Sequence, residues 1–242
     1  MSFLKHSSCP ACGSKDNLAN YSDGSKWCFG CHYYERGDTS PFVKEREDGE
    51  TEELDDRQRM VELYERSGEE LDERAVKWLS SFGVDVARGI GAGFKWNRYW
   101  EQLLFPLFDK GGHLCCVQAK NFNSERAKKA KYYNTGDKSL SCTTYGSGTT
   151  LVLCEDVVSS LRIGATTASM PLLGTSIAKE RLAALKGLYS ELVVWLDADK
   201  WKEATEIAQQ AQLLGYKARA LFTELDPKEY TDKEIYDYIC TQ

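Results

Sequence analysis

Two short runs of hydrophobic residues, 151–154 (Leu-Val-Leu-Cys) and 192–196 (Leu-Val-Val-Trp-Leu), form the clearest pattern in the chain. Continuous runs of this length, rich in valine and leucine, are typical of strands buried on both faces, as in a parallel sheet. Each run stops abruptly at acidic residues, Glu155-Asp156 after the first and Asp197-Ala198-Asp199 after the second. The pattern therefore places carboxylates at the ends of two predicted strands.

Helical and strand patterns alternate between and beyond these two runs. Helices are predicted over residues 157–163, 177–186 and 204–214, and further strands over 165–170 and 217–222. The sequence Leu173-Gly174-Thr175-Ser176 predicts a glycine turn whose hydroxyl groups cap the second of these helices. The resulting order, β-α-β-α-β-α-β, predicts an α/β fold in which a parallel sheet is flanked by helices.

A mixed pattern precedes this region. Amphipathic helices are predicted over residues 54–63 and 73–82, and strands over 103–108 and 114–117 predict a β-hairpin. The segment Gly89-Ile90-Gly91-Ala92-Gly93 lacks the residue order of a phosphate-binding loop and predicts a turn. These elements indicate an α+β region ahead of the parallel sheet.

Composition limits the location and the partners of the protein. The chain has 242 residues and a formal net charge of −6, with a pI of about 5.3, which argues against tight, indiscriminate binding of DNA. The sequence shows no signal peptide and no apolar run long enough to span a membrane. Its nine cysteines, in a reducing compartment, indicate metal ligands and buried thiols. We expect a cytoplasmic protein with no membrane partner.

Four cysteines near the N-terminus have the spacing of a zinc site. Cys9 and Cys12 form one C-x2-C pair, Cys28 and Cys31 form a second, and 15 residues separate the pairs. Two such pairs close on one tetrahedral zinc ion. Because four thiolates fill the coordination sphere, the sequence predicts one structural zinc rather than a catalytic one.

Aromatic and basic residues are interleaved around the second cysteine pair. Stacking on aromatic rings and phosphate contacts from cations suit single-stranded nucleic acid. So small a ribbon also needs aromatic residues for its core, so we expect about half of this set to be buried, with Lys26 and Arg36 outside. The set comprises Tyr21, Asp23, Ser25, Lys26, Trp27, Phe29, Tyr33, Tyr34 and Arg36.

Two segments of unusual charge follow. Residues 39–56 are rich in glutamate and aspartate and predict a solvated, flexible linker. Residues 118–138 form a basic strip, which would help to neutralise a polyphosphate substrate; within it, Lys128 and Lys129 are interpreted as solvated. The basic residues of the strip are Lys120, Arg126, Lys128, Lys129, Lys131 and Lys138.

The acidic residues at the strand ends suggest phosphoryl-transfer chemistry. Because the carboxyl ends of parallel strands line one crevice, Glu155, Asp197 and Asp199 should converge there. Carboxylates held this close repel one another, and a divalent cation relieves the repulsion. Oxygen ligands with positions left for water and phosphate suit magnesium.

These residues resemble a known family. Glu155 after a strand, the turn 173–176 and the Asp197-x-Asp199 pair resemble the Toprim fold shared by bacterial-type primases, type IA and II topoisomerases and some nucleases; the turn is most similar to that of primases. The segments 106–112, with Pro-Leu-Phe-Asp-x-x-Gly, and 131–135, with Lys-Tyr-Tyr-Asn-Thr, resemble the subdomain that precedes Toprim in primases. The first strand end departs from the family's Glu-Gly-x-x-Asp, because Asp156 replaces the glycine and Ser159 the second acid.

The resemblance implies a DNA primase, which makes short RNA primers on a single-stranded DNA template from ribonucleoside triphosphates. Glu155, Asp197 and Asp199 would hold two catalytic magnesium ions. Lys120 and Lys131 would assist catalysis by binding nucleotide and template, together with Asn134. The residues that would read the start site on the template are Asp23, Ser25, Lys26, Trp27 and Arg36.

The resemblance also implies a domain order. It runs as a zinc ribbon over residues 1–38, the acidic linker over 39–56, a basic α+β primase subdomain over 57–145, a Toprim catalytic domain over 146–225 and a C-terminal tail over 226–242. The sequence contains no Gly-x-x-x-x-Gly-Lys-[Ser/Thr] motif of an ATPase motor. This favours a stand-alone bacteriophage primase that works with a separate replicative helicase in the host cytoplasm.

Other interpretations stay open. A non-catalytic recombination mediator also combines a four-cysteine zinc site with Toprim, although such mediators place a helix-hairpin-helix before the zinc and none precedes Cys9. A Toprim nuclease or topoisomerase is a third possibility. Asp226, in the sequence Asp226-Pro227-Lys228-Glu229, resembles an additional acid that assists the metals in some family members, but a plain turn is the favoured interpretation.

Overall fold

The computed structural model describes residues 3–21, 24–31, 33–35 and 56–240. Contacts between residues divide the chain into two compact units, 1–54 and 55–242. The predicted linker lies outside the described residues, except for its last residue, Asp56, which begins a helix. Asp23 and Arg36, two of the predicted start-site residues, also lie outside them.

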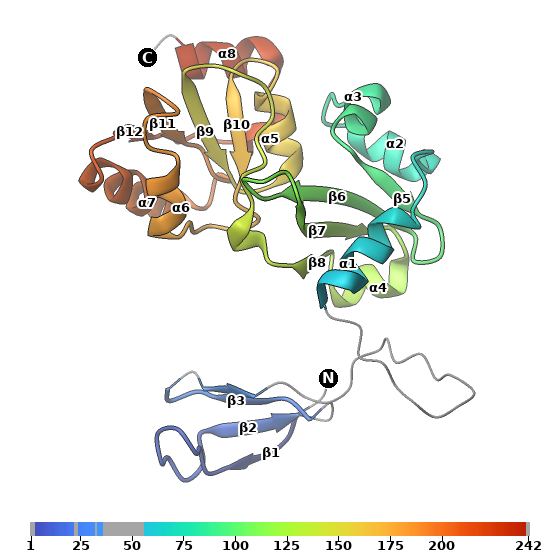
Figure 1. Ribbon diagram of the computed structural model, residues 1–242, viewed down its shortest axis with the longest axis vertical. Coiled ribbons are helices and arrows are strands. Elements are labelled where there is room, and N and C mark those ends of the chain that lie inside the picture. Colours follow the sequence, from blue (N-terminus) through green and yellow to red (C-terminus); the bar gives the residue numbers. More distant parts are fainter. Residues whose placement is uncertain (1–2, 22–23, 32, 36–55, 241–242) are drawn as a thin grey trace. The chain divides into compact units, whose positions relative to one another are not determined.

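The first unit is an antiparallel ribbon of four strands, shown in blue in Figure 1. Its core is small and consists of Leu18 with the buried cysteines Cys9 and Cys28, against which Tyr33 packs. Half of the cysteine quartet thus serves as hydrophobic core. The strands, paired in chain order, are β1 (Phe3–Ser7), β2 (Leu18–Tyr21), β3 (Lys26–Cys28) and β4 (Tyr34–Glu35).

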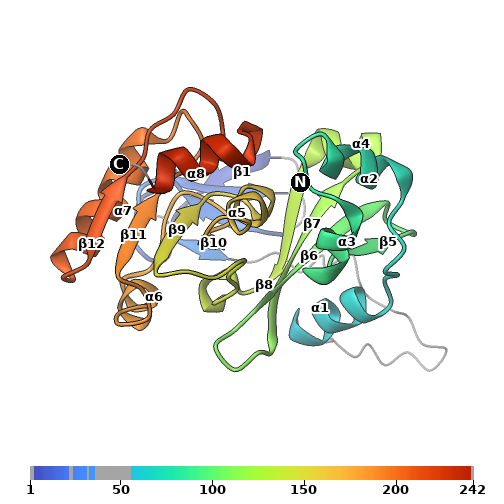
Figure 2. The same cartoon turned by 90° about the horizontal axis from the view of Figure 1, so that it is seen from above.

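An antiparallel sheet opens the second unit. Its strands pair in the order β5 (Lys95–Asn97), β6 (Gln102–Phe108), β7 (Leu114–Asn121) and β8 (Tyr132–Gly136), which confirms the predicted hairpin. Helix α1 (Asp56–Glu65) packs Met60 against one face, while α2 (Glu73–Ser80) and α3 (Val86–Gly91) share the core of the other face. Helix α4 (Ser124–Lys129) connects β7 to β8 along the chain and lies at one end of this sheet (Figure 2).

The glycine-rich segment 89–93 is not simply a turn, as the sequence suggested. Gly89 and Gly91 lie in helix α3, which Asp85 starts by accepting a hydrogen bond from the Arg88 N–H at 2.7 Å. A Cβ atom on Gly89 would lie 3.1 Å from the Phe94 ring, so the absence of a side chain lets Phe94 pack on the helix. The turn itself comes afterwards, at Gly93, whose φ is +80°.

The second sheet is parallel throughout, as the sequence predicted. Strands β9 (Thr150–Cys154), β10 (Ala168–Pro171), β11 (Glu191–Val194) and β12 (Lys217–Ala220) pair in the order β10-β9-β11-β12. In the register of the central pair, Leu192 lies opposite Leu151. The ends of β9 and β11 are therefore nearly level.

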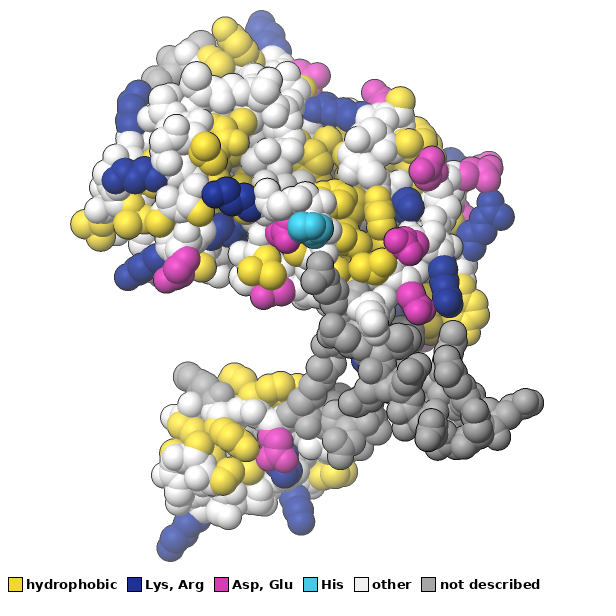
Figure 3. Space-filling model, viewed as in Figure 1, with side chains coloured by type: hydrophobic (Ala, Val, Ile, Leu, Met, Phe, Trp, Pro, Cys, Tyr) yellow, Lys and Arg dark blue, Asp and Glu magenta, His cyan; other side chains and the backbone are white. Residues whose placement is uncertain are grey.

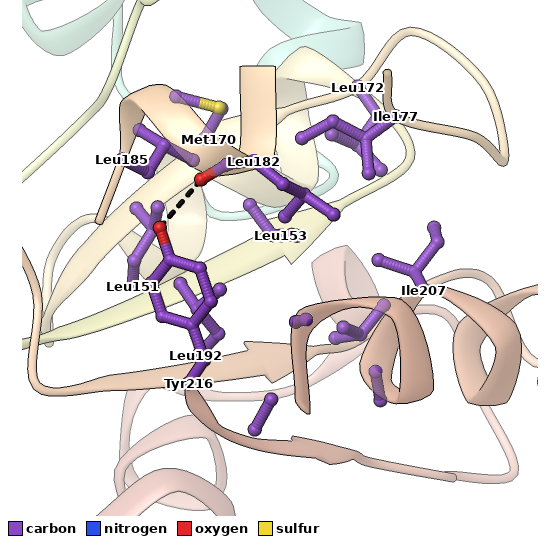
Figure 4. Packing of buried hydrophobic residues seen from close by; sticks show 14 of the residues in the cluster. Leu151, Leu153, Met170, Leu172, Ile177, Leu182, Leu185, Leu192, Ile207 and Tyr216 are labelled. Carbon is purple, nitrogen blue, oxygen red and sulfur yellow. Dashed lines mark hydrogen bonds between the residues drawn. The ribbon is translucent and has the colours of Figure 1, made fainter. Parts of the chain in front are cut away.

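Both faces of the parallel sheet are covered by helices (Figures 1 and 2). Leu151 and Leu153 point to the face covered by α6 (Lys179–Ala184) and α7 (Trp201–Leu213), where Leu182 and Ile207 meet them (Figure 4). Alternate residues point to the opposite face, covered by α5 (Val157–Ile163) and α8 (Asp232–Cys240). Burial on both faces explains why these strands are continuous hydrophobic runs.

The start of helix α6 and the packing of helix α8 differ from the sequence prediction. Helix α6 begins after Ala178 without a side-chain cap, so the hydroxyl groups of Thr175 and Ser176 do not cap it as predicted. Ile235 and Ile239 of α8 belong to the core of the sheet, so residues 226–240 are an integral part of the second unit.

Among the described residues, no helix is both long and apolar enough to cross a membrane.

Candidate active site

Two of the three predicted acidic residues meet at the carboxyl end of the parallel sheet. Glu155 directly follows β9, and Asp197 comes shortly after the neighbouring strand β11. Between β11 and Asp197, the Trp195 N–H donates to the Leu153 carbonyl at 2.9 Å. This hydrogen bond extends the pairing of the two segments beyond the end of β11. The Glu155 and Asp197 carboxylates interact electrostatically, and the charge of Glu155 is among those that raise the pKa of Asp197.

Burial and mutual repulsion shape the ionisation of these two acids. Burial, followed by the charges of Asp156 and Asp226, raises the pKa of Asp197 to about 7, against the opposing effect of Lys228. Burial and the charge of Asp156 also raise the pKa of Glu155. Within the described residues, the buried oxygens Glu155 Oε2 and Asp197 Oδ1 have no hydrogen-bond partner. Two orphaned carboxylate oxygens in a repulsive field fit the binding of a divalent cation.

The third predicted acid, Asp199, has different surroundings. Its side chain is 74% exposed and pairs with the ammonium of Lys200. In the part of the chain that the structure describes, the four cysteines are the only group of three or more potential ligands whose atoms all lie within 4.8 Å of one another. Glu155 and Asp197 thus form the inner part of the acidic site, and Asp199 lies at its rim.

Asp156, which replaces the family's glycine, has a structural role. Its Oδ1 accepts from the Val158 and Ser159 N–H groups at 2.8 and 3.0 Å, which starts helix α5. Its Oδ2 accepts from the Ser159 hydroxyl at 2.8 Å and from the Lys228 ammonium at 3.1 Å. Four donors match the four lone pairs of a carboxylate, so Asp156 is fully engaged by the protein.

Lys228 is a functional-site residue that the sequence interpretation missed. Besides Asp156, its ammonium contacts Asp226 at 3.0 Å and Asp197 at 3.6 Å. Asp226 in turn accepts from the Ala198 N–H at 3.2 Å. The segment was interpreted as a plain turn, but the structure brings Asp226 to the acidic site, directly before the short 3-10 helix η2 (Pro227–Glu229) that contains Lys228.

Trp195 and Tyr230 hold this last loop against the sheet. The Trp195 indole donates to the Thr223 hydroxyl at 2.8 Å, and its ring centre lies 5.8 Å from that of Tyr230. The Tyr230 hydroxyl accepts from the Leu225 N–H at 3.1 Å. The loop that carries Lys228 is therefore attached to strand β11, directly before Asp197.

Lys120 lies in a cage of three aromatic rings. Its ammonium is 4.6 Å from the ring centre of Trp78, 5.3 Å from Phe122 and 5.1 Å from Tyr132, and the residue is only 7% exposed. Burial, followed by the charge of Lys131, lowers the pKa of Lys120 to about 8. The two predicted lysines thus lie close enough to repel, and both face the Tyr132 ring, with Lys131 at 5.9 Å.

The rest of the basic strip is arranged around these residues. Asn134, on the exposed strand β8, accepts a hydrogen bond from the Gln118 amide at 3.1 Å. Lys138 donates to the Leu173 carbonyl at 2.6 Å, and the Gly174 N–H donates to the Glu155 carbonyl at 3.2 Å. The predicted glycine turn therefore links the basic strip to the strand end that carries Glu155. In Figure 3, basic and acidic side chains of the described residues are mixed over the visible face.

The zinc ribbon carries four cysteines positioned for a zinc site. The Sγ atoms of Cys9 and Cys31 are 3.7 Å apart, and those of Cys12 and Cys28 are 3.8 Å apart. Tetrahedral coordination at a zinc–sulfur distance of about 2.3 Å requires sulfur separations of roughly 3.8 Å. The observed spacing fits a closed, structural zinc site.

The predicted start-site residues lie next to this site where they are described. Ser25 is buried, with 2% of its surface exposed. Lys26 contacts Glu35 at 2.8 Å, and the Trp27 ring centre is 6.3 Å from that of Tyr34. Exposed rings such as Phe29 leave part of the aromatic set at the surface, as the sequence predicted.

Solved structures of DNA primases have folds similar to that of this chain. The zinc-binding and RNA polymerase domains of the Aquifex aeolicus primase match with a TM-score of 0.63 and 13% identity, over 100% of this chain and 80% of that one. The RNA polymerase domain of Mycobacterium tuberculosis primase DnaG matches with a TM-score of 0.59, 17% identity and coverages of 76% and 81%. The DnaG primase catalytic domain bound to single-stranded DNA matches with a TM-score of 0.58 and 15% identity, over 74% of this chain and 74% of that one.

These similarities establish the fold of both units. The two units, each by itself, resemble in fold a primase zinc-binding domain and a primase catalytic core. No family model matches the sequence, and no curated protein matches it.

Proposed function

We propose that this protein is a DNA primase, which synthesises short RNA primers on single-stranded DNA by nucleotidyl transfer. The observation that carries the proposal is the pair of orphaned carboxylate oxygens, Glu155 Oε2 and Asp197 Oδ1, at the ends of adjacent parallel strands. They belong to a fold shared with primase catalytic domains, one of which is bound to single-stranded DNA. We assign the parallel sheet to the Toprim fold.

The acidic residues would hold the catalytic metal. Glu155 and Asp197 would bind magnesium through their free oxygens, and Asp199, once released from Lys200, would complete the ligand set. Magnesium bound there supplies charge stabilisation for phosphoryl transfer and activates the attacking hydroxyl group. The protein contributes a half-buried position for the ligands, because Glu155 directly follows β9 and Asp197 comes three residues after the end of the paired strand β11.

The lysines of the basic strip would bind the triphosphate and the template. Within the described residues, Lys120 forms no ion pair, and its ammonium is held by aromatic rings instead of carboxylates. Its charge is therefore free to act on a phosphate. Lys131, which is exposed and lies near the Tyr132 ring, and Asn134 on β8 would contact the same ligands.

The zinc ribbon would select the start site. Its exposed aromatic rings and the side chains of Lys26 and Trp27 offer stacking and phosphate contacts. We also propose that a separate replicative helicase is the partner, and that the protein is of the bacteriophage type. A pull-down with the cognate helicase that shows neither association nor stimulated priming would contradict the partner assignment.

Incorporation of labelled ribonucleotides on single-stranded templates of varied sequence tests the function. We expect the wild type to make short products. Asp197→Asn should reduce the amount of product by at least about a hundredfold, since a metal ligand is lost. Cys28→Ser should make synthesis insensitive to the start sequence of the template. Primer synthesis that survives both Asp197→Asn and Asp199→Asn would disprove the assignment. DNA binding without magnesium and without product would favour a recombination mediator.

A further inference from the structure

We propose that Lys228 is a built-in cation of the acidic site, which takes the place of a second divalent ion. The inference rests on the proposed function, because it concerns the metal that this function requires. Its ammonium contacts Asp156, Asp226 and Asp197 at 3.1, 3.0 and 3.6 Å. An ammonium has three protons, and three carboxylates surround it.

The carboxylates of the acidic site fall into two groups, according to whether donors from the protein occupy their oxygens. All four lone pairs of Asp156 are taken by Val158, Ser159 and Lys228. Both oxygens of Asp226 also accept, from the Ala198 N–H and from Lys228. Among the carboxylates that the structure describes, Glu155 Oε2 and Asp197 Oδ1 are the only buried oxygens without a hydrogen-bond partner. One side of the cluster is thus neutralised by the protein, and the other is open to a metal.

Lys228 is held too firmly to be an incidental contact. Its side chain is 17% exposed, although lysine is almost never buried without a charged partner. The Trp195–Tyr230 contact and the Trp195–Thr223 hydrogen bond fix the loop that carries it. Placing an ammonium among carboxylates that could otherwise hold a cation excludes a second ion by charge repulsion and by occupation of the space.

The sequence shows a matching rearrangement on the acidic side. Ser159 stands where the Toprim pattern has a second acid, and it is fully buried, with its hydroxyl donating to Asp156. Asp156, which stands at the glycine position of that pattern, restores the number of carboxylates, but its oxygens accept from Val158, Ser159 and Lys228. The carboxylate gained is therefore neutralised by Lys228, and one divalent ion then suffices for the rest of the site.

Counting bound Mn²⁺ tests this inference without relying on activity. The full-length, zinc-loaded protein is titrated with Mn²⁺, and free Mn²⁺ is followed by electron paramagnetic resonance. We expect one site in the wild type that Glu155→Gln removes. Lys228→Met should bind a second ion or bind the first about tenfold more tightly, because a cation is lost 3.6 Å from the Asp197 carboxylate. Lys228→Arg should restore the wild-type result.

Melting temperature gives an independent measurement. In magnesium-free buffer, Lys228→Met should melt well below the wild type, because three carboxylates lose their counter-ion, and added magnesium should recover much of the difference. The matched control is Lys233→Met, at an exposed position in helix α8, which should change neither the Mn²⁺ titration nor the melting temperature.

Each outcome decides the question. Two wild-type Mn²⁺ ions of similar affinity would overturn the inference, even if Lys228→Met does not fold. Unchanged Mn²⁺ binding by a folded Lys228→Met would overturn it as well, while primer synthesis by the wild type would leave the proposed function intact. A wild type that neither binds Mn²⁺ at Glu155 nor makes primers would refute the function itself.

Discussion

Lys120 and Tyr132 are cross-strand partners in β7 and β8, and the lysine ammonium lies 5.1 Å from the centre of the tyrosine ring. The same tyrosine also interacts electrostatically with the acidic site, because burial and then the charge of Asp156 raise the pKa of Tyr132. Tyr132 therefore contacts the basic strip and lies near enough to the acidic residues to interact with their charge.

The lowered pKa of Lys120, about 8, predicts a pH dependence of nucleotide binding. The charged form predominates below pH 8 and is lost as the pH rises through 8, so the KM for ribonucleoside triphosphates should rise on the alkaline side. Steady-state priming kinetics between pH 6.5 and 9.5 measure this. Lys120→Met should raise the KM about tenfold at pH 7, since one charge-assisted contact is lost.

Lys120→Arg separates charge from position in this prediction. An arginine stays charged throughout the range, so its KM should not rise between pH 8 and 9.5. The matched control is Lys128→Met, because Lys128 is exposed and forms a solvent-exposed ion pair with Glu125; its KM profile should follow the wild type. An alkaline rise that persists in Lys120→Arg would assign the titration to another group.

The Leu173-Gly174 turn predicts a position that tolerates only glycine. Gly174 has φ +145°, and a Cβ atom there would lie 3.2 Å from the Lys138 ammonium, which donates to the Leu173 carbonyl. Gly174→Ala should lower the free energy of unfolding by about 1–3 kcal/mol and reduce priming, because the turn holds the Glu155 backbone. Chemical denaturation and primer synthesis measure the two effects.

Gly187 provides the control for backbone strain alone. Its φ is +85°, but no heavy atom lies within 4 Å of the position of an added Cβ. Gly187→Ala should therefore destabilise by only about 1 kcal/mol and leave priming unchanged. Equal losses of activity in the two variants would show that the contact with Lys138 is unimportant.

The sequence predicted the strand-end acids because their signals are local. A strand buried on both faces is a short hydrophobic run, and the residue that ends it is visible in the next position, as with Glu155 and Asp197. The N-cap of helix α3 was equally local: Asp85 precedes it, but the glycines that follow obscured the helix.

Lys228 and the cage of Lys120 could not be found in this way. Lys228 reaches Asp156 from 72 residues further along the chain, and its position depends on how the last loop packs against Trp195. The rings around Lys120 come from α2, from the residue after β7 and from β8. Such juxtapositions arise from tertiary packing, for which a single sequence has no local signal.

The two-unit organisation predicts that loss of zinc is confined to the ribbon. Cys28 is buried in a core of three residues, so Cys28→Ser should release the metal and unfold the ribbon, as in small zinc domains generally. The melting temperature of the second unit should not change. Zinc content and hydrogen exchange of the two units measure this, with Cys240→Ser, at an exposed position, as the control. A shifted melting temperature of the second unit would show that the two units depend on each other.

Arg162 should be among the most sensitive positions for stability in the second unit. Its guanidinium, 8% exposed, donates to the Gly83 carbonyl at 3.3 Å and the Tyr230 carbonyl at 2.7 Å, and contacts Asp232 at 2.7 Å. It therefore joins α5, the loop after α2 and the segment that carries Lys228. Arg162→Leu leaves two carbonyl groups without their donor and should lower the free energy of unfolding by about 2–4 kcal/mol.

Arg98→Leu is the matched control for this change. Arg98 also forms an ion pair, with Glu70 at 2.8 Å, but both side chains are more than three-quarters exposed. Solvent screens such a pair, so its loss should cost less than about 0.5 kcal/mol. Thermal and chemical denaturation of the two variants compare a buried connection with an exposed one. Similar losses in both would mean that Arg162 acts through its charge alone, whereas the carbonyl contacts predict a large difference, because only a buried acceptor suffers when its donor is removed.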